Sequence, residues 1–436
     1  MTKLTFAARL AACVFTAMLV SCGGGGEEGG ADPKIRLLNL STGYSSLDLM
    51  TNLDSDEDDE DETQLENVAL DSVGDFVTLD PDDYTIKLRR SGSGSVLRSF
   101  AGEQLVEDTI NTYVAYGDVG QFGALRIDES LADADAGDNT LHVANVSSAG
   151  ALDVYLTDAA TDLDDTTPVL SGVGAALAVV SAESGSHRLR VTATGDTSDV
   201  RLDIPDFALA DRGVGSLILT STQGGMLANA IYLPQQGEPV KFANTKARVR
   251  GAVALADGAS ATIQVGGKSI LTSATAGVIA SRYTVLDAGS LPVNIVVNGS
   301  AVAAPNVTLA AGADYTLMVW SNAEGAQTSL LVDDNRLPAG GSSMTKLRLL
   351  NGMSTLAAPI TLAIDFSPVI EGTLLGEVSD EEEITAGTDR QFDVSNTSNA
   401  AAVLTRTGIS LQGNSVYTFF VTDNGGTPIG VLRRDR

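Results

Sequence analysis

The sequence has very few of the residues that usually carry covalent or metal chemistry. Its 436 residues include two cysteines, two histidines and one tryptophan. Cys13 lies in an apolar N-terminal stretch that we expect to be removed. Cys22 is then left without a disulfide partner, and burial alone must hold each domain together. His142 and His187 are not spaced as a ligand pair, which argues against a zinc site.

Motifs of the common enzyme folds are also missing. The chain contains no Gly-x-Ser-x-Gly elbow, no phosphate-binding P-loop and no dinucleotide-binding glycine pattern. These absences indicate a protein that is not an enzyme. One catalytic class stays open, because a chain with 56 Asp and Glu residues can always supply two carboxylates for a hydrolase.

Positive charge is scarce as well. The chain carries 27 Lys and Arg residues against 56 Asp and Glu, a formal net charge of −29 at pH 7. Such an excess repels nucleic acid and anionic lipid surfaces, so we expect no nucleic-acid partner. We interpret the charge mainly as a source of solubility, because an acidic surface keeps copies of a β-rich protein apart.

The first 21 residues are predicted to form a signal peptide. Lys3 and Arg9 supply its positively charged start, and Leu10 to Val20 form an apolar stretch too short to span a bilayer. Leu19-Val-Ser-Cys22 resembles the bacterial lipobox, the sequence at which lipoprotein precursors are cleaved. The resemblance implies a lipoprotein precursor.

Cys22 is the predicted lipidation site. In a lipobox this cysteine receives a diacylglyceryl group and usually a further acyl chain, and two or more chains anchor a protein stably. Residues 22–33 follow as a tether that contains Gly23–Gly26. Because Gly23 rather than aspartate follows the cysteine, the resemblance favours the outer membrane if the host is Gram-negative. We therefore expect a cell-envelope protein whose membrane contact is the lipid at Cys22.

One β pattern opens four successive stretches of the chain. The openings are Lys34-Ile-Arg-Leu-Leu-Asn39, Thr140-Leu-His-Val-Ala-Asn145, Lys246-Ala-Arg-Val-Arg-Gly251 and Lys346-Leu-Arg-Leu-Leu-Asn351. Their third residues, Arg36, His142, Arg248 and Arg348, lie 106, 106 and 100 residues apart, about the length of one β-sandwich domain. The predicted domains are residues 34–130, 139–236, 240–338 and 344–436, of which the third is the most divergent.

The local pattern predicts strands throughout. Alternating apolar stretches such as Tyr84–Leu88 recur, and no segment keeps a helical period with caps. Each repeat closes with an apolar run, a glycine-containing turn suited to a tight hairpin, and another apolar run. The four turns are Gly117-Asp-Val-Gly120, Thr222-Gln-Gly-Gly225, Asn322-Ala-Glu-Gly325 and Asp423-Asn-Gly-Gly426. We expect an all-β fold of four tandem antiparallel β-sandwich, immunoglobulin-like domains in an elongated rod.

The first two repeats resemble a known family, the bacterial secreted domain of unknown function numbered 4397. Members show an Arg-x-x-Asn-x-Ser opening and a later Val-Asp-Val-Tyr strand. The matching residues are Arg36-Leu-Leu-Asn39-Leu-Ser41 with Leu47-Asp-Leu49, and His142-Val-Ala-Asn145-Val-Ser147 with Leu152-Asp-Val-Tyr155. The usual proline after the serine is absent, and the third repeat lacks both Asn and Asp. The resemblance implies tandem lipoprotein domains and no settled activity.

The acidic run Asp54–Glu62 is the most unusual local feature. It places eight carboxylates among nine residues, and such oxygen ligands could hold Ca²⁺. The candidate ligands are Asp54, Asp56, Asp58, Asp59 and Asp61. The EF-hand pattern fails, because Asp59 replaces the glycine and Leu65 the final glutamate, so the alternative is a solvated, self-repelling loop. Weaker acidic clusters occur at Asp162–Asp165 and Asp380–Glu383.

These observations favour a non-enzymatic, lipid-anchored envelope protein that acts as a structural spacer or as a binding and adhesion rod. An alternative is a module that captures polysaccharide or peptide, which would need exposed aromatic residues or a concave polar cleft. The lone Trp320 lies in an alternating stretch where we expect it to be buried or half-buried, so it gives little support to stacking on sugars. No cofactor is expected beyond weakly bound Ca²⁺.

Overall fold

The computed structural model describes residues 30–54, 60–256, 258–356 and 358–436. Strands dominate this part of the chain, and its only helix is the short 3-10 helix η1 (Gly341–Ser343). The all-β class predicted from the sequence is therefore confirmed. In the same ranges no helix is long and apolar enough to cross a membrane.

The strands form four two-layered sandwiches, numbered 1 to 4 in chain order, and each encloses a hydrophobic cluster of its own. The ends of the domains predicted from the repeats stay a prediction. Sandwich 1 contains β1 (Lys34–Leu40), β2 (Ser46–Leu53), β3 (Glu62–Ala69), β4 (Ser72–Val73), β5 (Val77–Thr78), β6 (Asp82–Arg90), β7 (Val96–Leu105), β8 (Ile110–Tyr116) and β9 (Gly123–Asp128). Sandwich 2 contains β10 (Asp138–Asn145), β11 (Leu152–Thr157), β12 (Leu170–Val173), β13 (Ala178–Glu183), β14 (Gly185–Ala193), β15 (Asp196–Leu209), β16 (Gly213–Ser221), β17 (Ala228–Pro234) and β18 (Val240–Phe242).

The second half of the chain repeats this plan. Sandwich 3 contains β19 (Lys246–Ala254), β20 (Ser260–Val265), β21 (Lys268–Thr275), β22 (Thr284–Asp287), β23 (Gly289–Leu291), β24 (Val293–Val297), β25 (Ser300–Val302), β26 (Val307–Leu309), β27 (Asp314–Asn322) and β28 (Gly325–Asp333). Sandwich 4 contains β29 (Met344–Gly352), β30 (Ile360–Ile364), β31 (Ser367–Thr373), β32 (Glu382–Thr385), β33 (Gly387–Asn396), β34 (Ala402–Leu411), β35 (Ser415–Asn424) and β36 (Thr427–Arg434).

Each sandwich has a first sheet, which holds its opening strand, and a second sheet, and sandwich 3 also contains the two-stranded sheet β23–β26. The opening strand lies beside the first strand of the closing hairpin and is parallel to it, in the pairs β1–β8, β10–β16, β19–β27 and β29–β35. The chain passes through the second sheet between the two, which gives the crossover that a parallel pair needs. The other strand pairs are antiparallel as predicted, whereas this parallel pair was not predicted from the sequence.

The parallel pairs show which residues are equivalent in the four repeats. In sandwich 3 the equivalent of Arg36 is Arg250, two residues beyond the Arg248 that the sequence comparison selected. Both arginines lie on the same face of β19, because side chains alternate along a strand, so the pattern could not separate them. The equivalent cross-strand pairs are Arg36 with Thr112, His142 with Ser216, Arg250 with Thr316 and Arg348 with Thr418.

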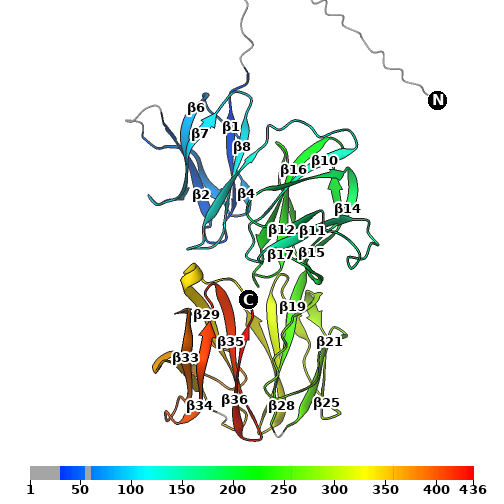
Figure 1. Ribbon diagram of the computed structural model, residues 1–436, viewed down its shortest axis with the longest axis vertical. Coiled ribbons are helices and arrows are strands. Elements are labelled where there is room, and N and C mark those ends of the chain that lie inside the picture. The colour runs from blue at the N-terminus through cyan, green and yellow to red at the C-terminus, as the bar shows by residue number, and fades with distance from the viewer. Residues whose placement is uncertain (1–29, 55–59, 257, 357) are drawn as a thin grey trace, which may run out of the picture.

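The sandwiches pack side by side in two pairs, 1 with 2 and 3 with 4 (Figure 1). The first sheets meet face to face because their outward residues are apolar as well as their inward ones. The contact between sandwiches 1 and 2 is formed by Leu38, Leu40, Val114, Ile127, Ile218, Ile231 and Leu233. The contact between sandwiches 3 and 4 is formed by Ala252, Ala254, Ile279, Met318, Leu350 and Phe420. The predicted rod is therefore two sandwiches wide rather than one.

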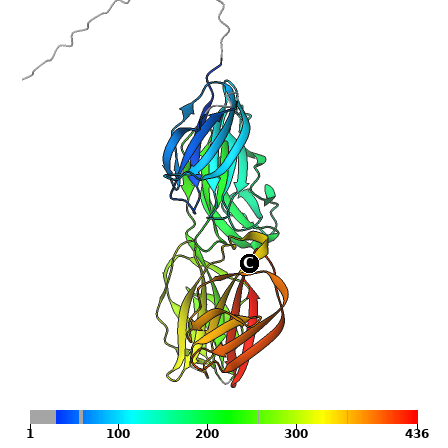
Figure 2. The same ribbon diagram turned by 90° about the vertical axis from the view of Figure 1, so that its left-hand side faces the viewer.

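The two pairs are stacked along the long axis of the molecule. Figure 2 shows one pair above the other, with the C-terminal end of the chain between them. The described chain begins at the end of sandwich 1 that lies away from sandwiches 3 and 4 (Figure 1). We call the level at which the two pairs meet the waist.

We call sandwiches 1 and 2 the upper pair and sandwiches 3 and 4 the lower pair. We predict that Phe420→Ala lowers the free energy of unfolding of the lower pair by about 3–5 kcal/mol, because Phe420 is fully buried in the contact between sandwiches 3 and 4. Urea unfolding measures the change. The matched control is Phe366→Ala in the same sandwich, where the ring is 79% exposed and the loss should be about 0.5 kcal/mol or less. Equal losses from the two variants would contradict the packing described here.

Candidate functional site

The asparagines of the opening motif hold the two sheets of a sandwich together. Asn39 donates its side-chain amide to the Val68 carbonyl of the second sheet and accepts the Ser41 backbone N–H, so it joins the two sheets where β1 ends. Asn145 and Asn351 do the same in sandwiches 2 and 4. The three amides are buried within their own sandwiches and offer nothing to a ligand.

The motif aspartates are also structural. Asp48 accepts hydrogen bonds from the Asn67 backbone N–H, the Ser91 hydroxyl and the Arg89 guanidinium. Burial raises the pKa of Asp48, but these donors more than offset it and leave the pKa below its ordinary value. Asp153 is held in the same way in sandwich 2, chiefly by backbone N–H groups. Neither carboxylate is available for catalysis.

A buried arginine, threonine and carboxylate recur on the outward face of three first sheets. The arginine donates through Nε to the threonine hydroxyl at 2.8–2.9 Å, and the threonine donates to a carboxylate at or just after the end of the closing hairpin. All of these side chains are at most 3% exposed. The sets are Arg36, Thr112 and Glu129 in sandwich 1, Arg250, Thr316 and Asp333 in sandwich 3, and Arg348, Thr418 and Asp435 in sandwich 4.

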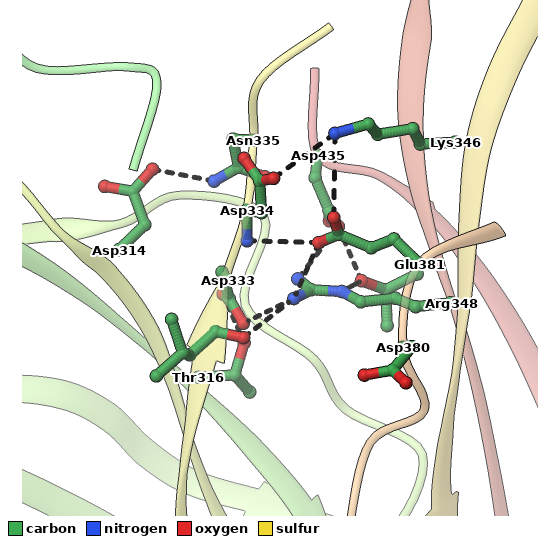
Figure 3. A network of polar contacts seen from close by, with 12 residues as sticks. Asp314, Thr316, Asp333, Asp334, Asn335, Lys346, Arg348, Asp380, Glu381 and Asp435 are labelled. Atoms are coloured by element: carbon green, nitrogen blue, oxygen red, sulfur yellow. Dashed lines mark hydrogen bonds and ion pairs between the residues drawn. The ribbon is translucent and has the colours of Figure 1, made fainter. Parts of the chain in front are cut away.

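The sets of sandwiches 3 and 4 exchange partners across their interface. Arg250 forms an ion pair with Asp435 of sandwich 4, and Arg348 forms one with Asp333 of sandwich 3 at 2.9 Å. Figure 3 shows Arg348 between Asp333, Glu381 and Asp435. Each arginine thus binds the carboxylate of the opposite sandwich as well as the threonine of its own, so the network fixes how the two first sheets face each other.

This network leaves no free acid or base at its centre. Burial alone would raise the pKa of Asp333, but Arg348 and Arg250 lower it below the ordinary value. The nearby Tyr283 hydroxyl donates to Asp333 at 2.7 Å, and burial raises the pKa of Tyr283 well above its ordinary value. The groups therefore keep fixed charges near neutral pH, which suits a structural joint and not proton transfer.

Sandwich 2 has replaced the charged set by neutral or weakly basic groups. By register, His142 takes the place of the arginine and Ser216 that of the threonine, while Gln235 occupies the place of the acid. Burial lowers the pKa of His142, so the imidazole is neutral at pH 7. Glu129 of sandwich 1 instead accepts a hydrogen bond from the Gln236 backbone N–H at 2.5 Å. Sandwiches 1 and 2 are joined without reciprocal ion pairs.

A second charged group lies at the edge of the joint between sandwiches 3 and 4. Asp334 accepts both Nε and Nη2 of Arg336 and also pairs with Lys346 at 3.2 Å. Glu381 accepts the Asp334 backbone N–H at 3.2 Å (Figure 3). Burial and the neighbouring Asp334 charge raise the pKa of Glu381 to about 7. Against the cost of burial, Arg336 and Lys346 lower the pKa of Asp334 to about 2.

Backbone hydrogen bonds tie the upper pair to the lower pair at the waist. The closing turn of sandwich 2 enters between two loops of sandwich 3, where Gly224 donates to the Gly312 carbonyl at 2.9 Å and accepts the Asn335 N–H at 3.2 Å. Gly225 has φ of +81°, and a Cβ there would lie 2.8 Å from the backbone nitrogen of Arg336. Glycine is required at this position by both its conformation and the close approach.

Three adjoining hollows surround Arg336 at the waist and form what we call the waist groove. They have volumes of about 390, 400 and 490 Å³, and all three include Arg336. Thr42 and Asp118 line the first and third of these hollows, and Gln223 lines the second and third. Sandwiches 1 and 2 contribute their closing turns, and sandwich 3 contributes the segment after β28. The groove therefore exists only where the two pairs meet.

More than half of the residues that line the waist groove have polar side chains, although apolar atoms form the larger part of its surface. Arg336 lies 44% exposed in the centre, held by Asp334. Hydroxyl and amide groups come from Thr42, Gln121, Thr220, Ser221, Thr222, Gln223, Asn229, Asn244 and Tyr315, and charged groups from Asp71, Asp118, Asp333, Asp334, Arg336, Lys346 and Glu383. Tyr315 is the only aromatic residue among them. Such a surface recognises a ligand by hydrogen bonds and not by stacking.

Two of the five residues proposed as calcium ligands, Asp54 and Asp61, lie in the described chain, and each has a partner of its own. Asp54 accepts hydrogen bonds from the Thr85 hydroxyl and the Gly102 backbone, and Asp61 pairs with Lys87. Asp56, Asp58 and Asp59 lie outside the described residues, as does Cys22. Across the ranges that the structure covers, no three His, Cys, Asp or Glu residues are grouped as metal ligands.

The weaker acidic clusters have other partners. Asp162 and Asp164 lie in the loop between β11 and β12, where Asp164 accepts the Thr197 hydroxyl. Glu381 and Glu383 face the segment between sandwiches 3 and 4, and Glu383 accepts the Ala339 backbone N–H at 2.7 Å. Their position beside Lys346 and Arg348 indicates a role as counter-charges.

Trp320 is half-buried as predicted from the sequence. It packs at the edge of the contact between sandwiches 3 and 4, and its Nε1 donates to the Ser329 hydroxyl at 2.9 Å. A Cβ on Gly376 would lie 2.5 Å from the indole ring, so glycine lets the opposite sandwich approach the tryptophan. Trp320 belongs to the joint and not to the waist groove.

The comparisons with known proteins agree with the resemblance seen in the sequence. Residues 33–155 match the model of the family described as Domain of unknown function (DUF4397), which confirms the likeness over sandwich 1 and the first two strands of sandwich 2. No curated protein matches the chain. One solved structure that aligns is "Crystal structure of CBMbc (family CBM26) from Eubacterium rectale Amy13K in Complex with Maltoheptaose". It covers 48% of this chain and 96% of its own at 10% identity, and its TM-score of 0.15 is too low to assign any ligand here.

We predict that Glu381 makes the protein less stable as the pH rises from about 5 to 8. The folded state holds the Glu381 proton up to about pH 7, whereas the unfolded chain releases it near its ordinary pKa of 4.5, so ionisation costs stability across this interval. Glu381→Gln should therefore reduce the fall in the free energy of unfolding between pH 5 and pH 8 by on the order of 3 kcal/mol.

Urea unfolding at pH 5 and pH 8 measures the effect. Glu371→Gln, which changes an exposed glutamate of the same sandwich, is the control and should keep the wild-type decline. The prediction is wrong if Glu381→Gln declines as steeply as the wild type.

Proposed function

We propose that this protein is a non-enzymatic, lipid-anchored cell-envelope protein that holds a ligand in the waist groove. The observation that carries the proposal is the groove itself, a concave surface between the two pairs of sandwiches that many polar side chains line. A concave polar cleft is the feature that distinguishes a capturing module from a plain spacer. The ligand class that fits hydroxyl, amide and carboxylate groups is a polysaccharide or peptide chain at the envelope.

The state of the buried carboxylates supports a role other than catalysis. Glu129, Asp314, Asp333 and Asp435 each form an ion pair with a buried arginine. Such pairs occupy the carboxylate oxygens with hydrogen bonds, whereas hydrolysis needs one carboxyl group that can give up a proton to the substrate and one that can take part in the attack.

Asp334 and Glu381 come nearest to a hydrolytic pair. They line one hollow of about 500 Å³, and their pKa values lie near 2 and 7. However, both oxygens of Asp334 accept hydrogen bonds from Arg336, and one also contacts Lys346. A carboxylate bound in this way is a poor nucleophile or base, so the arrangement supports a positioning role for Asp334.

The position of the N-terminus supports an anchored arrangement. The described chain enters sandwich 1 at the end remote from sandwiches 3 and 4 (Figure 1), and its first residues are held there, since Gly30 and Ala31 donate to Glu107 and Asp108. With lipid at Cys22, the upper pair would lie toward the membrane and the lower pair away from it. We place the protein at the outer membrane, with the waist groove facing the surrounding envelope.

We predict that Cys22→Ser abolishes lipidation and releases the protein from the membrane fraction, because the thiol of Cys22 is the predicted acceptor of the acyl chains. Metabolic labelling with an alkyne-bearing palmitate, followed by fractionation, measures both effects. Cys13→Ser serves as the control and should keep both label and membrane attachment. Labelled, membrane-bound Cys22→Ser protein would refute the anchor.

We predict that the wild-type protein is retained on a glycan or cell-wall peptide array and that Arg336→Gln binds the retained ligand about tenfold more weakly or worse. Arg336 presents a charged donor in the centre of the groove, and loss of one charge-assisted hydrogen bond has an effect of this size. Titration calorimetry with the retained ligand gives the affinities.

The matched control is Arg390→Gln in sandwich 4. Its ion pair with Asp365 has the same 2.7 Å length as that of Arg336 with Asp334 but lies outside the groove. Undiminished binding by Arg336→Gln would place the ligand elsewhere, and an array without any retained ligand would leave only the spacer function.

A further inference from the structure

A second cavity lies between sandwiches 2 and 3 and shares no lining residue with the waist groove. It has a volume of about 560 Å³ and is lined mainly by the start of β15 and the segment that leads into β22. Asp435 of sandwich 4 closes one side. Like the groove, it depends on the way in which the two pairs are stacked. Its size is that of an ordinary small-molecule site.

The base of this cavity is formed by two buried arginines. Arg201 and Arg248 are 5% and 4% exposed. Arg248 donates Nε and Nη2 to both oxygens of Asp314 at 2.7 and 2.6 Å. Arg201 donates Nη2 to Asp199 at 2.6 Å and Nη1 to the Met226 carbonyl at 2.8 Å, while its buried Nε has no hydrogen-bond partner. A buried guanidinium with an unmet donor is unusual, because such groups are normally fully paired.

Two more cations stand at the mouth of the cavity and are loosely held. Lys268 is exposed and donates to the Val285 carbonyl at 2.9 Å. Arg282 is 77% exposed and reaches Asp196 at 3.2 Å. Exposed pairs of this kind contribute little to stability, so both side chains are free to turn toward a ligand.

Positive charge exceeds the negative charge that is available in this cavity. Four cationic side chains face three carboxylates, Asp196, Asp199 and Asp435. Asp435 is already paired with Arg250 and Arg348, and Arg248 with Asp314, and these three partners lie outside the cavity lining, which leaves two carboxylates for three cations. Burial and the neighbouring Arg248 charge lower the pKa of Arg201, as expected where like charges are crowded together. Such a concentration of cations contrasts with a chain whose net charge is −29.

We propose that this cavity binds the anionic group of a small ligand, either a carboxylate or a phosphate. Lys268 and Arg282 draw the anion to the mouth, and Arg201 and Arg248 supply the fixed positive field at the base. Guanidinium groups suit this purpose because their paired N–H donors match the oxygens of carboxylates and phosphates. The proposal is independent of the waist groove, since the two sites have different lining residues and different charge.

Titration calorimetry of the folded protein with sodium phosphate and with sodium glucuronate tests the proposal, at constant ionic strength kept by sodium chloride. We expect saturable binding of at least one anion with one site per chain. Binding of glucuronate alone identifies the carboxylate of an acidic sugar as the ligand group, and binding of phosphate alone identifies a phosphate. Absence of saturable heat from both anions up to millimolar concentrations would overturn the proposal.

The double variant Lys268→Gln, Arg282→Gln removes the two exposed cations and leaves the buried base unchanged. It should bind the same anion about tenfold more weakly, with an unchanged midpoint of thermal unfolding. Arg390→Gln removes an arginine of sandwich 4 that is 27% exposed and does not line the cavity, and it should bind as the wild type does. If both variants lose affinity equally, binding reflects the general charge of the protein and the proposed site is wrong.

Discussion

The reciprocal ion pairs between sandwiches 3 and 4 are the interaction on which the rest of the structure depends. Arg250 binds Asp435 and Arg348 binds Asp333, each across the interface and each with almost no exposure to solvent. Burying four charges is costly, and the cost is tolerable only if every charge is paired and hydrogen-bonded. Thr316 and Thr418 complete that pairing from the parallel neighbouring strands. Since an unpaired charge would remain if the sheets slipped, the network selects a single arrangement.

The upper pair reaches a similar arrangement by different means. His142 and Gln235 stand where sandwich 4 has an arginine and an aspartate, and apolar residues provide most of the contact. The closing turns of sandwiches 1 and 2 both reach the waist, and in sandwich 2 it is Gly224 and Gly225 of this turn that contact sandwich 3.

Both proposed binding surfaces arise between domains. The waist groove is made by the closing turns of sandwiches 1 and 2 and by the segment after β28, and the cationic cavity is made by sandwiches 2, 3 and 4. In contrast, the motif residues Asn39 and Asp48 form their hydrogen bonds within a single sandwich. The motif therefore reports the fold of a single domain, while the surfaces that could carry function depend on how several domains are joined.

The sequence by itself determined the strands, the repeat and the class of fold. Period-two alternation assigns residues to a face, and glycines such as Gly325 and Gly426, with φ of +113° and +81°, mark the closing hairpins. The same alternation could not distinguish Arg248 from Arg250, because a shift of two residues preserves the face. The apolar residues Leu38 and Phe420 lie on the outward faces of their first sheets and are buried by a neighbouring sandwich. Alternation alone does not identify that neighbour.

Only the tertiary structure decided the pairing of sandwiches, the reciprocal ion pairs and both binding surfaces. Arg336 stands in a stretch of ordinary linker composition, and Arg201 in an ordinary strand, so neither carries a local signal. Their surroundings come from segments separated by tens to hundreds of residues along the chain. Local patterns report the dihedral preference and the face of each residue, whereas a contact between distant segments depends on burial and charge pairing summed over the whole molecule.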